Sequence, residues 1–266
     1  IADSMREYTL ISPYASYAEC SENTYWDAFT DGLKELLDKI GDKKKNIKAL
    51  GISAQGETLF FLDKNGKPLR NAIVWMDNRA VDEANELREK FTDDLCYKIT
   101  GQVSFDPCWP AAKILWVRKN EPEIFRNTAT FALIEDWFIH RLTGKMVSEG
   151  SLLCSTTYWN IITKKWWPEM LDYLGISEKQ LPEIMEPGQV VDKIRPDVAE
   201  QLGLPSDMTV CTGALDQAAG AIGIGNIKEG RFSENIGAAL AICAPLSRPM
   251  FDPNKKMPVH YFGIPD

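Results

Sequence analysis

The sequence predicts an α/β fold built from layers of helix and sheet. Apolar side chains recur at helical spacing over residues 26–40, and a short apolar run typical of a strand follows at residues 47–53. A second such run, residues 210–215, leads directly into a helix of small residues. Because helices and strands alternate along the chain, we expect helices to pack against a sheet.

The first half of the chain is expected to contain two strands, two helices and a hairpin. Asn23 is the expected N-cap of the first helix, and Gly41 ends it. The hairpin turn ends in Asn65-Gly66, a pair that favours tight turns between strands. The expected elements are a strand at 8–12, a helix at 23–40, a strand at 47–53, a hairpin formed by 60–62 and 72–75, and a helix at 79–91.

In the second half, Pro110 can open a helix at its first position, and Glu121-Pro122 ends it. The segment at 148–157 is rich in Ser and Thr and is expected to be a loop. The other expected elements are a strand at 131–134, helices at 135–142, 166–174 and 196–202, the strand at 210–215 with its helix, paired strands within 230–244, and a strand-like run at 259–262.

Composition excludes several classes of protein. The 266 residues are 44% hydrophobic and 26% charged, which suits one large or two modest globular domains. A net charge of −8 argues against nucleic-acid binding, and no run approaches the roughly 20 apolar residues of a membrane span. Six scattered cysteines without a C-x-x-C pair predict a reducing, cytoplasmic setting, and with only two histidines they argue against a metal site.

Asp216 is the candidate catalytic residue. It lies where the strand at 210–215 passes into a helix, and the unpaired N–H groups at a helix N-terminus favour a carboxylate. A carboxylate at the carboxyl end of a strand is well placed to take a proton from a bound substrate. The alternative is that Asp216 only caps its helix.

Polar clusters follow the ends of several predicted strands, where the ligands of open α/β sheets bind. Carboxylates and amides pair with hydroxyl groups, and an aromatic face covers the C–H side, so we expect a cleft for a polyhydroxy compound. The residues expected to line this cleft are Gln55, Glu57, Asp77, Arg79 and Asp216, with Trp75 as its wall.

Each of these residues also has a simpler interpretation. Gln55 and Glu57 are equally compatible with a solvated loop. Asp77 and Arg79 are equally compatible with an exposed ion pair that contributes little stability. A tryptophan at a strand end, such as Trp75, is more often part of the core than of a ligand site.

Taken together and in order, these segments resemble the FGGY family of carbohydrate kinases, which includes xylulose, glycerol, gluconate and ribulose kinases. The resemblance extends over essentially the whole chain. It rests on GISAQGE at 51–57, VWMDNR at 74–79, KILW at 113–116, EDW at 135–137, RLTG at 141–144 and GALDQAAG at 213–220.

The resemblance implies a ribonuclease H-like, actin-like ATPase fold, with a mixed central sheet flanked by helices. It implies that residues 1–266 are the N-terminal, sugar-binding domain without its first strands, and that the C-terminal, ATP-binding domain is absent from this chain. Relatives of this family often form dimers, so a homodimer is expected.

Site residues are carried over by position. Asp216 would be the general base, and Gln217 and Glu57 would bind the substrate. Gly56 lies where glycerol kinases carry an arginine, which counts against glycerol as the substrate. The other implied residues are Trp75, which would line the substrate pocket, Trp109 with Cys108, near a substrate-contacting position, and Gly237 with Ala238, in a turn that contacts ATP phosphates.

The implied activity is ATP-dependent phosphorylation of a sugar or polyol hydroxyl, with Mg²⁺ on the phosphates and no metal ligand from the chain. This chain alone is expected to be inactive. Ala238 replaces a threonine of the phosphate turn, and this favours an alternative, a non-catalytic sugar-binding or regulatory relative. A hydrolase using Glu57 and Asp216 is a more distant alternative.

Overall fold

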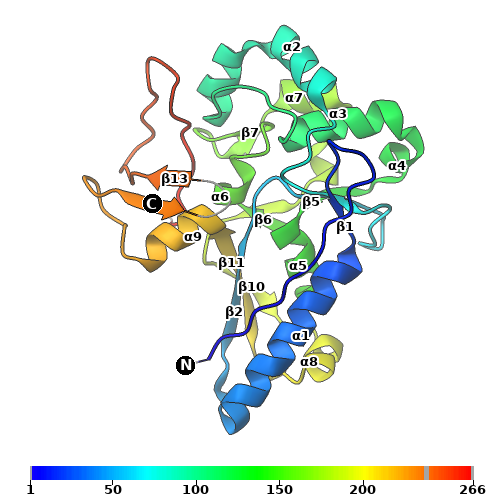
Figure 1. Cartoon of the computed structure of the whole chain (residues 1–266), viewed down its shortest axis with the longest axis vertical. Helices are drawn as coiled ribbons and strands as arrows, with labels where there is room; N and C mark the ends of the chain where they lie inside the picture. The colour runs from blue at the N-terminus through cyan, green and yellow to red at the C-terminus, as the bar shows by residue number, and fades with distance from the viewer. Residues whose placement is uncertain (1, 237–239, 265–266) are drawn as a thin grey trace.

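The computed structural model describes residues 2–236 and 240–264 (Figure 1). Two sheets form its centre. A three-stranded sheet has the order β10 (Val190–Lys193), β11 (Thr209–Leu215) and β2 (Ala49–Ala54). A four-stranded sheet has the order β1 (Glu19–Cys20), β4 (Ala72–Ile73), β3 (Leu59–Leu62) and β5 (Thr130–Leu133).

The three-stranded sheet is mixed. β11 runs parallel to β2 and antiparallel to β10, so the carboxyl ends of β2 and β11 lie side by side, with Leu215 paired to Ala54. The register between β11 and β2 shifts between Cys211 and Ala214. Gly213 lies in this irregularity, where a Cβ atom would lie 1.7 Å from the carbonyl oxygen of Ile52. Only glycine therefore fits where these two strands approach most closely.

The four-stranded sheet is antiparallel and contains the expected hairpin. β3 pairs with β4 on one side and with β5 on the other. All four residues of β3 are buried, which shows that this strand is covered on both faces. The hairpin prediction is confirmed, and Gly66 has the positive φ (75°) that its turn requires.

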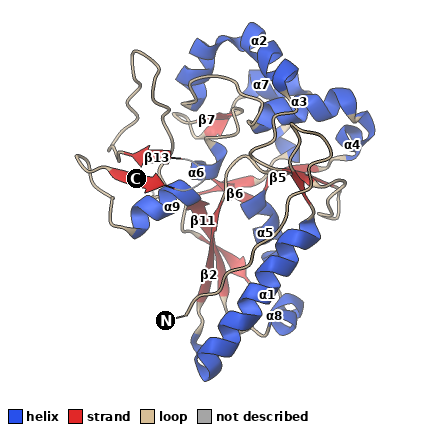
Figure 2. Cartoon of the chain, in the orientation of Figure 1, coloured by secondary structure: helices blue, strands red, loops and turns tan. Residues whose placement is uncertain are grey.

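Helix α5 (Ile134–Thr143) packs against all three strands of the mixed sheet, and α1 (Glu22–Ile40) lies beyond it (Figure 2). Aromatic rings join the two helices, including Trp26 with Trp137 and Phe29 with Phe138. The N-cap of α1 is Ser21, whose hydroxyl accepts from Thr24 N. The prediction of Asn23 was wrong because Ser21 is placed to satisfy an unpaired amide of the first turn.

Several expected boundaries differ from the structure. α2 (Val81–Thr100) continues beyond residue 91 through a kink at Thr92, and the helix expected from residue 166 begins at Pro168 as α7 (Pro168–Leu174). The expected loop at 148–157 contains part of a strand and a helical turn, β6 (Val147–Glu149) and α6 (Gly150–Leu153).

The other elements are short. The helices are α3 (Pro110–Asn120), α4 (Pro122–Asn127), α8 (Pro196–Leu202) and α9 (Asp216–Gly223), with 3-10 turns at Gly41–Asn46 and Glu178–Gln180. The strands are β7 (Trp159–Asn160), β8 (Lys165–Trp166), β9 (Glu183–Met185), β12 (Ser233–Ile236) and β13 (Leu240–Cys243). In the described part of the chain, no helix has the length and apolarity needed to cross a bilayer.

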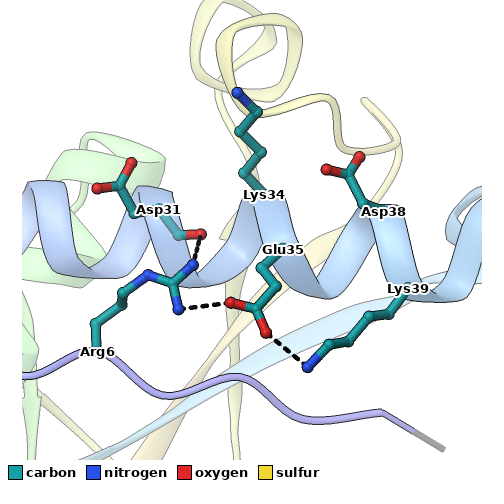
Figure 3. A pocket seen from close by; sticks show the side chains of 6 residues that line it. All are labelled: Arg6, Asp31, Lys34, Glu35, Asp38 and Lys39. Carbon is teal, nitrogen blue, oxygen red and sulfur yellow. Dashed lines mark hydrogen bonds and ion pairs between the residues drawn. The ribbon is translucent and has the colours of Figure 1, made fainter.

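The expected strand at 8–12 is absent from the described residues, and only Ile11 makes an isolated bridge, to Glu19. The segment before it is instead attached to α1 by side chains. Arg6 pairs with Glu35 and donates to the carbonyl of Asp31 (Figure 3). Lys39 donates to the carbonyl of Asp3. A strand forms only when the edge of a neighbouring strand is available to pair with it. Here the neighbour of this segment is the surface of helix α1, which offers no such edge. The run at 259–262 is likewise not a strand in the described structure.

Candidate functional site

The candidate site is built at the junction of β11 and α9. Asp216 is the first residue of α9 and is exposed, and its Oδ1 accepts a hydrogen bond of 2.7 Å from Gln217 N. The N-cap position itself is Leu215, so the carboxylate satisfies one free amide of the first turn and remains open to solvent. Its neighbour Gln217 is half-buried on the same turn.

Buried side chains hold the other side of this junction. Glu135 of α5 accepts from Gly213 N at 2.7 Å, and the Ser151 hydroxyl accepts from Leu215 N at 2.9 Å. Ser151 in turn donates to Glu149 at 2.6 Å. Burial raises the pKa of Glu149 to about 7 and that of Glu135 well above its usual range, and the Glu149 carboxyl adds to the rise at Glu135. Hydrogen bonds from the amides of Gly213 and Leu215 to buried side chains thus hold the backbone just before Asp216 in place.

The turn after β2 lies beside this junction because β2 and β11 are parallel neighbours. It contains Gln55, Gly56 and Glu57, which therefore follow the strand end next to the one that Asp216 follows. At Gly56, a Cβ atom would lie 3.0 Å from Leu215 Cδ1 and 3.1 Å from the Ser155 hydroxyl. The turn is therefore packed closely against the end of β11.

Glu57 faces Asp216. Burial raises the pKa of the half-buried Glu57 to about 6, and the Asp216 carboxylate adds to this rise. The Lys113 ammonium and a hydrogen bond with Ser155 oppose it. The site therefore contains two neighbouring carboxyl groups, one of which changes its charge close to neutral pH.

Trp75 and Gln55 meet at a shared hydroxyl. Thr58 Oγ1 accepts from Trp75 N at 3.2 Å and from Gln55 Nε2 at 2.9 Å, and Gln55 Nε2 also donates to the Tyr25 hydroxyl at 3.1 Å. Trp75 is half-buried and packs against the core, so its alternative interpretation as a core residue holds in part. Trp109 precedes α3, and its indole donates to the carbonyl of Ser104 at 3.0 Å.

Asp77 and Arg79 form a buried network. The exposed ion pair considered from the sequence is wrong, because Asp77 is fully buried and Arg79 is 8% exposed. The guanidinium donates to both carboxylate oxygens of Asp77, at 2.9 and 2.8 Å, and to Glu19 at 2.8 Å, and it lies over the Tyr17 ring. Arg70 also pairs with Glu19. The Arg79 guanidinium is therefore occupied by Asp77 and Glu19 and makes no hydrogen bond or ion pair with Asp216 among the described residues.

Lys113 was part of a recognised motif but was not proposed as a site residue. It is fully buried, and its Nζ donates to the carbonyl oxygens of Glu57 and Val74. The available signal in the sequence was a single charged residue among the apolar side chains of residues 110–117. Gly237 and Ala238, the predicted phosphate-binding residues, lie outside the described part of the chain.

Two further observations concern places where ligands could bind. Across residues 2–236 and 240–264, no group of three or more His, Cys, Asp or Glu side chains is arranged to hold a metal ion. A charged groove of about 500 Å³ lies along α1, lined by Arg6, Asp31, Lys34, Glu35, Asp38 and Lys39 (Figure 3). This groove shares no residue with the Asp216 junction, and two of its cations, Arg6 and Lys39, pair with Glu35.

Comparisons with known proteins agree with this arrangement. The profile of the FGGY family of carbohydrate kinases, N-terminal domain, matches residues 1–223. The xylulose kinase of Bacillus subtilis is 32% identical over 238 residues, which cover 90% of this chain and 47% of that protein. The glycerol kinase of Thermococcus gammatolerans is 29% identical over 236 residues, 87% of this chain and 46% of that protein.

Solved structures agree as well. The ligand-bound xylulose kinase from Lactobacillus acidophilus matches with a TM-score of 0.87 and 30% identity, over 94% of this chain and 50% of that one. The xylulose kinase from Rhodospirillum rubrum, at 24% identity and a TM-score of 0.92, supports the fold alone. The chain spans about half the length of the relatives it matches. The predicted actin-like ATPase fold is confirmed, and the chain belongs to the FGGY family of carbohydrate kinases.

Proposed function

We propose that this chain is the sugar-binding part of an ATP-dependent kinase that phosphorylates a hydroxyl group of a sugar or polyol. The observation that carries the proposal is the pair of carboxyl groups, Glu57 and Asp216, at adjoining strand ends. A xylulose-like ketose is the leading substrate class, because several relatives are named xylulose kinases.

In the proposed reaction Asp216 is the general base. Its exposed carboxylate takes the proton of a substrate hydroxyl while that oxygen attacks the γ-phosphorus of ATP. The bond from the γ-phosphorus to its bridging oxygen breaks, and ADP leaves. Glu57, Gln217, Gln55 and Trp75 bind and orient the sugar beside Asp216. Trp109, the residue that precedes α3, would also contact the sugar.

The remaining parts of the proposal concern the whole protein. Residues 1–266 would form the N-terminal domain, and a C-terminal domain would bind ATP, with Mg²⁺ carried on the nucleotide phosphates. Gly237 and Ala238 would contact those phosphates through the backbone. The protein would act in the cytoplasm, and it would form a homodimer. Asp77 and Arg79 would support the substrate turns from behind through their buried network.

The test is a panel of ketoses, aldoses and polyols incubated with the complete protein, ATP and Mg²⁺, followed by detection of ADP and of the sugar phosphate. Phosphorylation of a ketose or a related polyol, absent without ATP, is the expected result. Sugar binding without ADP release would instead support the non-catalytic relative suggested by Ala238. Sugar cleavage without ATP would support a hydrolase.

A further inference from the structure

Lys113 is a buried ammonium beside the candidate site that the proposed reaction does not use. It lies on α3 with its side chain fully buried, between the apolar residues Ala112 and Ile114. A buried charge is costly, and a hydrophobic side chain of similar volume is often as stable or more stable in such a position. A lysine at this position therefore indicates that its ammonium makes a specific contact that an apolar side chain could not make.

The contacts of Lys113 join two separate turns. Its Nζ donates to the carbonyl oxygen of Glu57 at 2.8 Å and to that of Val74 at 3.0 Å. The first carbonyl belongs to the turn after β2, and the second belongs to the turn after β4. Val74 O also accepts from Asp77 N, at 3.0 Å. One ammonium thus connects the turn that contains Glu57 to the turn that contains Trp75.

The turn at Glu57 requires such a restraint. Glu57 has a φ of 59°, a left-handed backbone conformation that is unfavourable for a residue with a side chain. A strained residue keeps its conformation only when surrounding groups hold it. Lys113 holds its carbonyl and Ser155 holds its carboxyl group.

The charged groups around Lys113 come mainly from the two turns. Burial lowers the pKa of Lys113 to about 8, while Cys108, Glu57 and Asp77 act to raise it and Arg79 lowers it further. Cys108 lies just before α3, and Glu57, Asp77 and Arg79 follow β2 and β4. The ammonium therefore lies between the candidate site and the buried Asp77–Arg79 network, and it can fix one relative to the other.

We propose that Lys113 is a positioning residue that holds the Glu57 turn and the Trp75 turn at the separation needed to bind the sugar. This inference rests on the proposed function. Lys113 does not touch the substrate, and its removal acts through Glu57 and Trp75. ATP binding, assigned to other parts of the protein, does not depend on it.

The test compares Lys113→Met with Lys119→Met in the complete protein. Lys119 lies on the same helix but pairs with Glu83 and Glu86 of α2, so its substitution is a matched loss of charge. Lys113→Met is expected to raise the KM for the sugar about tenfold or more, as the loss of hydrogen bonds to a charged group implies. The KM for ATP should stay unchanged, and Lys119→Met should leave both constants unchanged. Equal changes in both KM values, or no change in either, would overturn the proposal.

Hydrogen exchange gives a measurement that does not depend on catalysis. The amides of residues 55–58 and 75–77 are expected to exchange faster in Lys113→Met than in Lys119→Met, with or without kinase activity. Unchanged exchange at both turns would refute the positioning role even if the wild type phosphorylates a sugar. If the wild type phosphorylates nothing, the proposed function fails, but the exchange result still decides the role of Lys113. Lys113→Gln, which keeps an amide donor, should be intermediate, and it decides the question alone if Lys113→Met does not fold.

Discussion

Two groups of charged residues follow strand ends in this chain, and the structure treats them differently. Glu57 and Asp216 lie at the open edge of the mixed sheet, with Asp216 exposed. Asp77 and Arg79 lie behind the next turn, where each is bonded to the other and Arg79 also to Glu19. In sequence the two groups look alike. The difference is that Asp216 can still form hydrogen bonds with a ligand, whereas Asp77 and Arg79 already form theirs with other protein groups.

This difference predicts opposite consequences of substitution. An exposed carboxylate contributes little to stability and can be changed at small cost to the fold. A buried ion pair, once broken, leaves a charge without a partner in a medium that cannot solvate it. Changes at the exposed Asp216 should therefore affect catalysis, and changes at Asp77 and Arg79 should affect folding.

The largest effect is expected for Asp216→Asn. The amide cannot take the proton of the sugar hydroxyl, so kcat should fall by about 10²–10⁴ or more. The sugar should still bind, because the amide keeps a hydrogen-bonding oxygen, and the melting temperature should be nearly unchanged. Steady-state kinetics and calorimetric titration of the sugar test this. Asp207→Asn, at an exposed residue before β11, is the control, and near-normal turnover in Asp216→Asn would contradict the assignment.

The next largest effect is expected for Arg79→Met, and it should appear in stability. The substitution leaves the carboxylates of Asp77 and Glu19 with fewer partners, and breaking a buried pair costs about 3–5 kcal/mol. Urea denaturation of the complete protein measures this loss. Arg195→Met removes a solvent-exposed pair with Asp197 and should change little. If both variants unfold at the same urea concentration, the buried contacts of Arg79 contribute no more to stability than a solvent-exposed ion pair does.

A smaller effect is expected from pH. The pKa of Glu57 is raised to about 6, so its carboxylate forms as the pH rises from 5 to 7. If the ionised form binds sugar hydroxyls, sugar affinity should increase over this range by up to about tenfold, which is the change in the ionised fraction across one unit on each side of the pKa. Glu57→Gln should remove this dependence, and Glu200→Gln, on the exposed side of α8, should keep it. A wild-type affinity that does not change with pH would show that the charge on Glu57 is unimportant.

Much of the fold could be predicted because it depends on local signals. Pro110 opens α3 and Pro196 opens α8 where their sequence positions indicated, and the segments on either side of Asn65-Gly66 pair as a hairpin. The strand expected at 8–12 failed because a strand also needs a neighbouring edge. Whether a neighbouring strand edge is available depends on the tertiary structure, and the sequence of a single segment does not show it.

The same limit applies to the site. The proximity of Glu57 and Asp216 was predictable because strand ends of one sheet edge gather ligand-binding residues. The roles of the buried residues Lys113 and Glu135 were not predictable from the sequence. Both lie on helices far away in sequence, and their hydrogen-bond partners are backbone groups. A charged residue within an apolar helix shows that something must compensate the charge, but not which group does so.

The smallest predicted effect concerns Glu135, the buried carboxyl group behind Asp216. Its pKa is raised well above its usual range by burial and by Glu149, so the folded protein keeps a proton there that the unfolded chain loses at lower pH. Stability should therefore fall as the pH rises toward the folded-state pKa. Glu135→Gln keeps an acceptor for Gly213 N and cannot ionise, so its melting temperature should fall less than that of the wild type between pH 6 and pH 9. Because Asp216 itself is untouched, kcat at pH 7 should change little. A large loss of kcat with an unchanged pH dependence of melting would place Glu135 with the catalytic group instead of the supporting one.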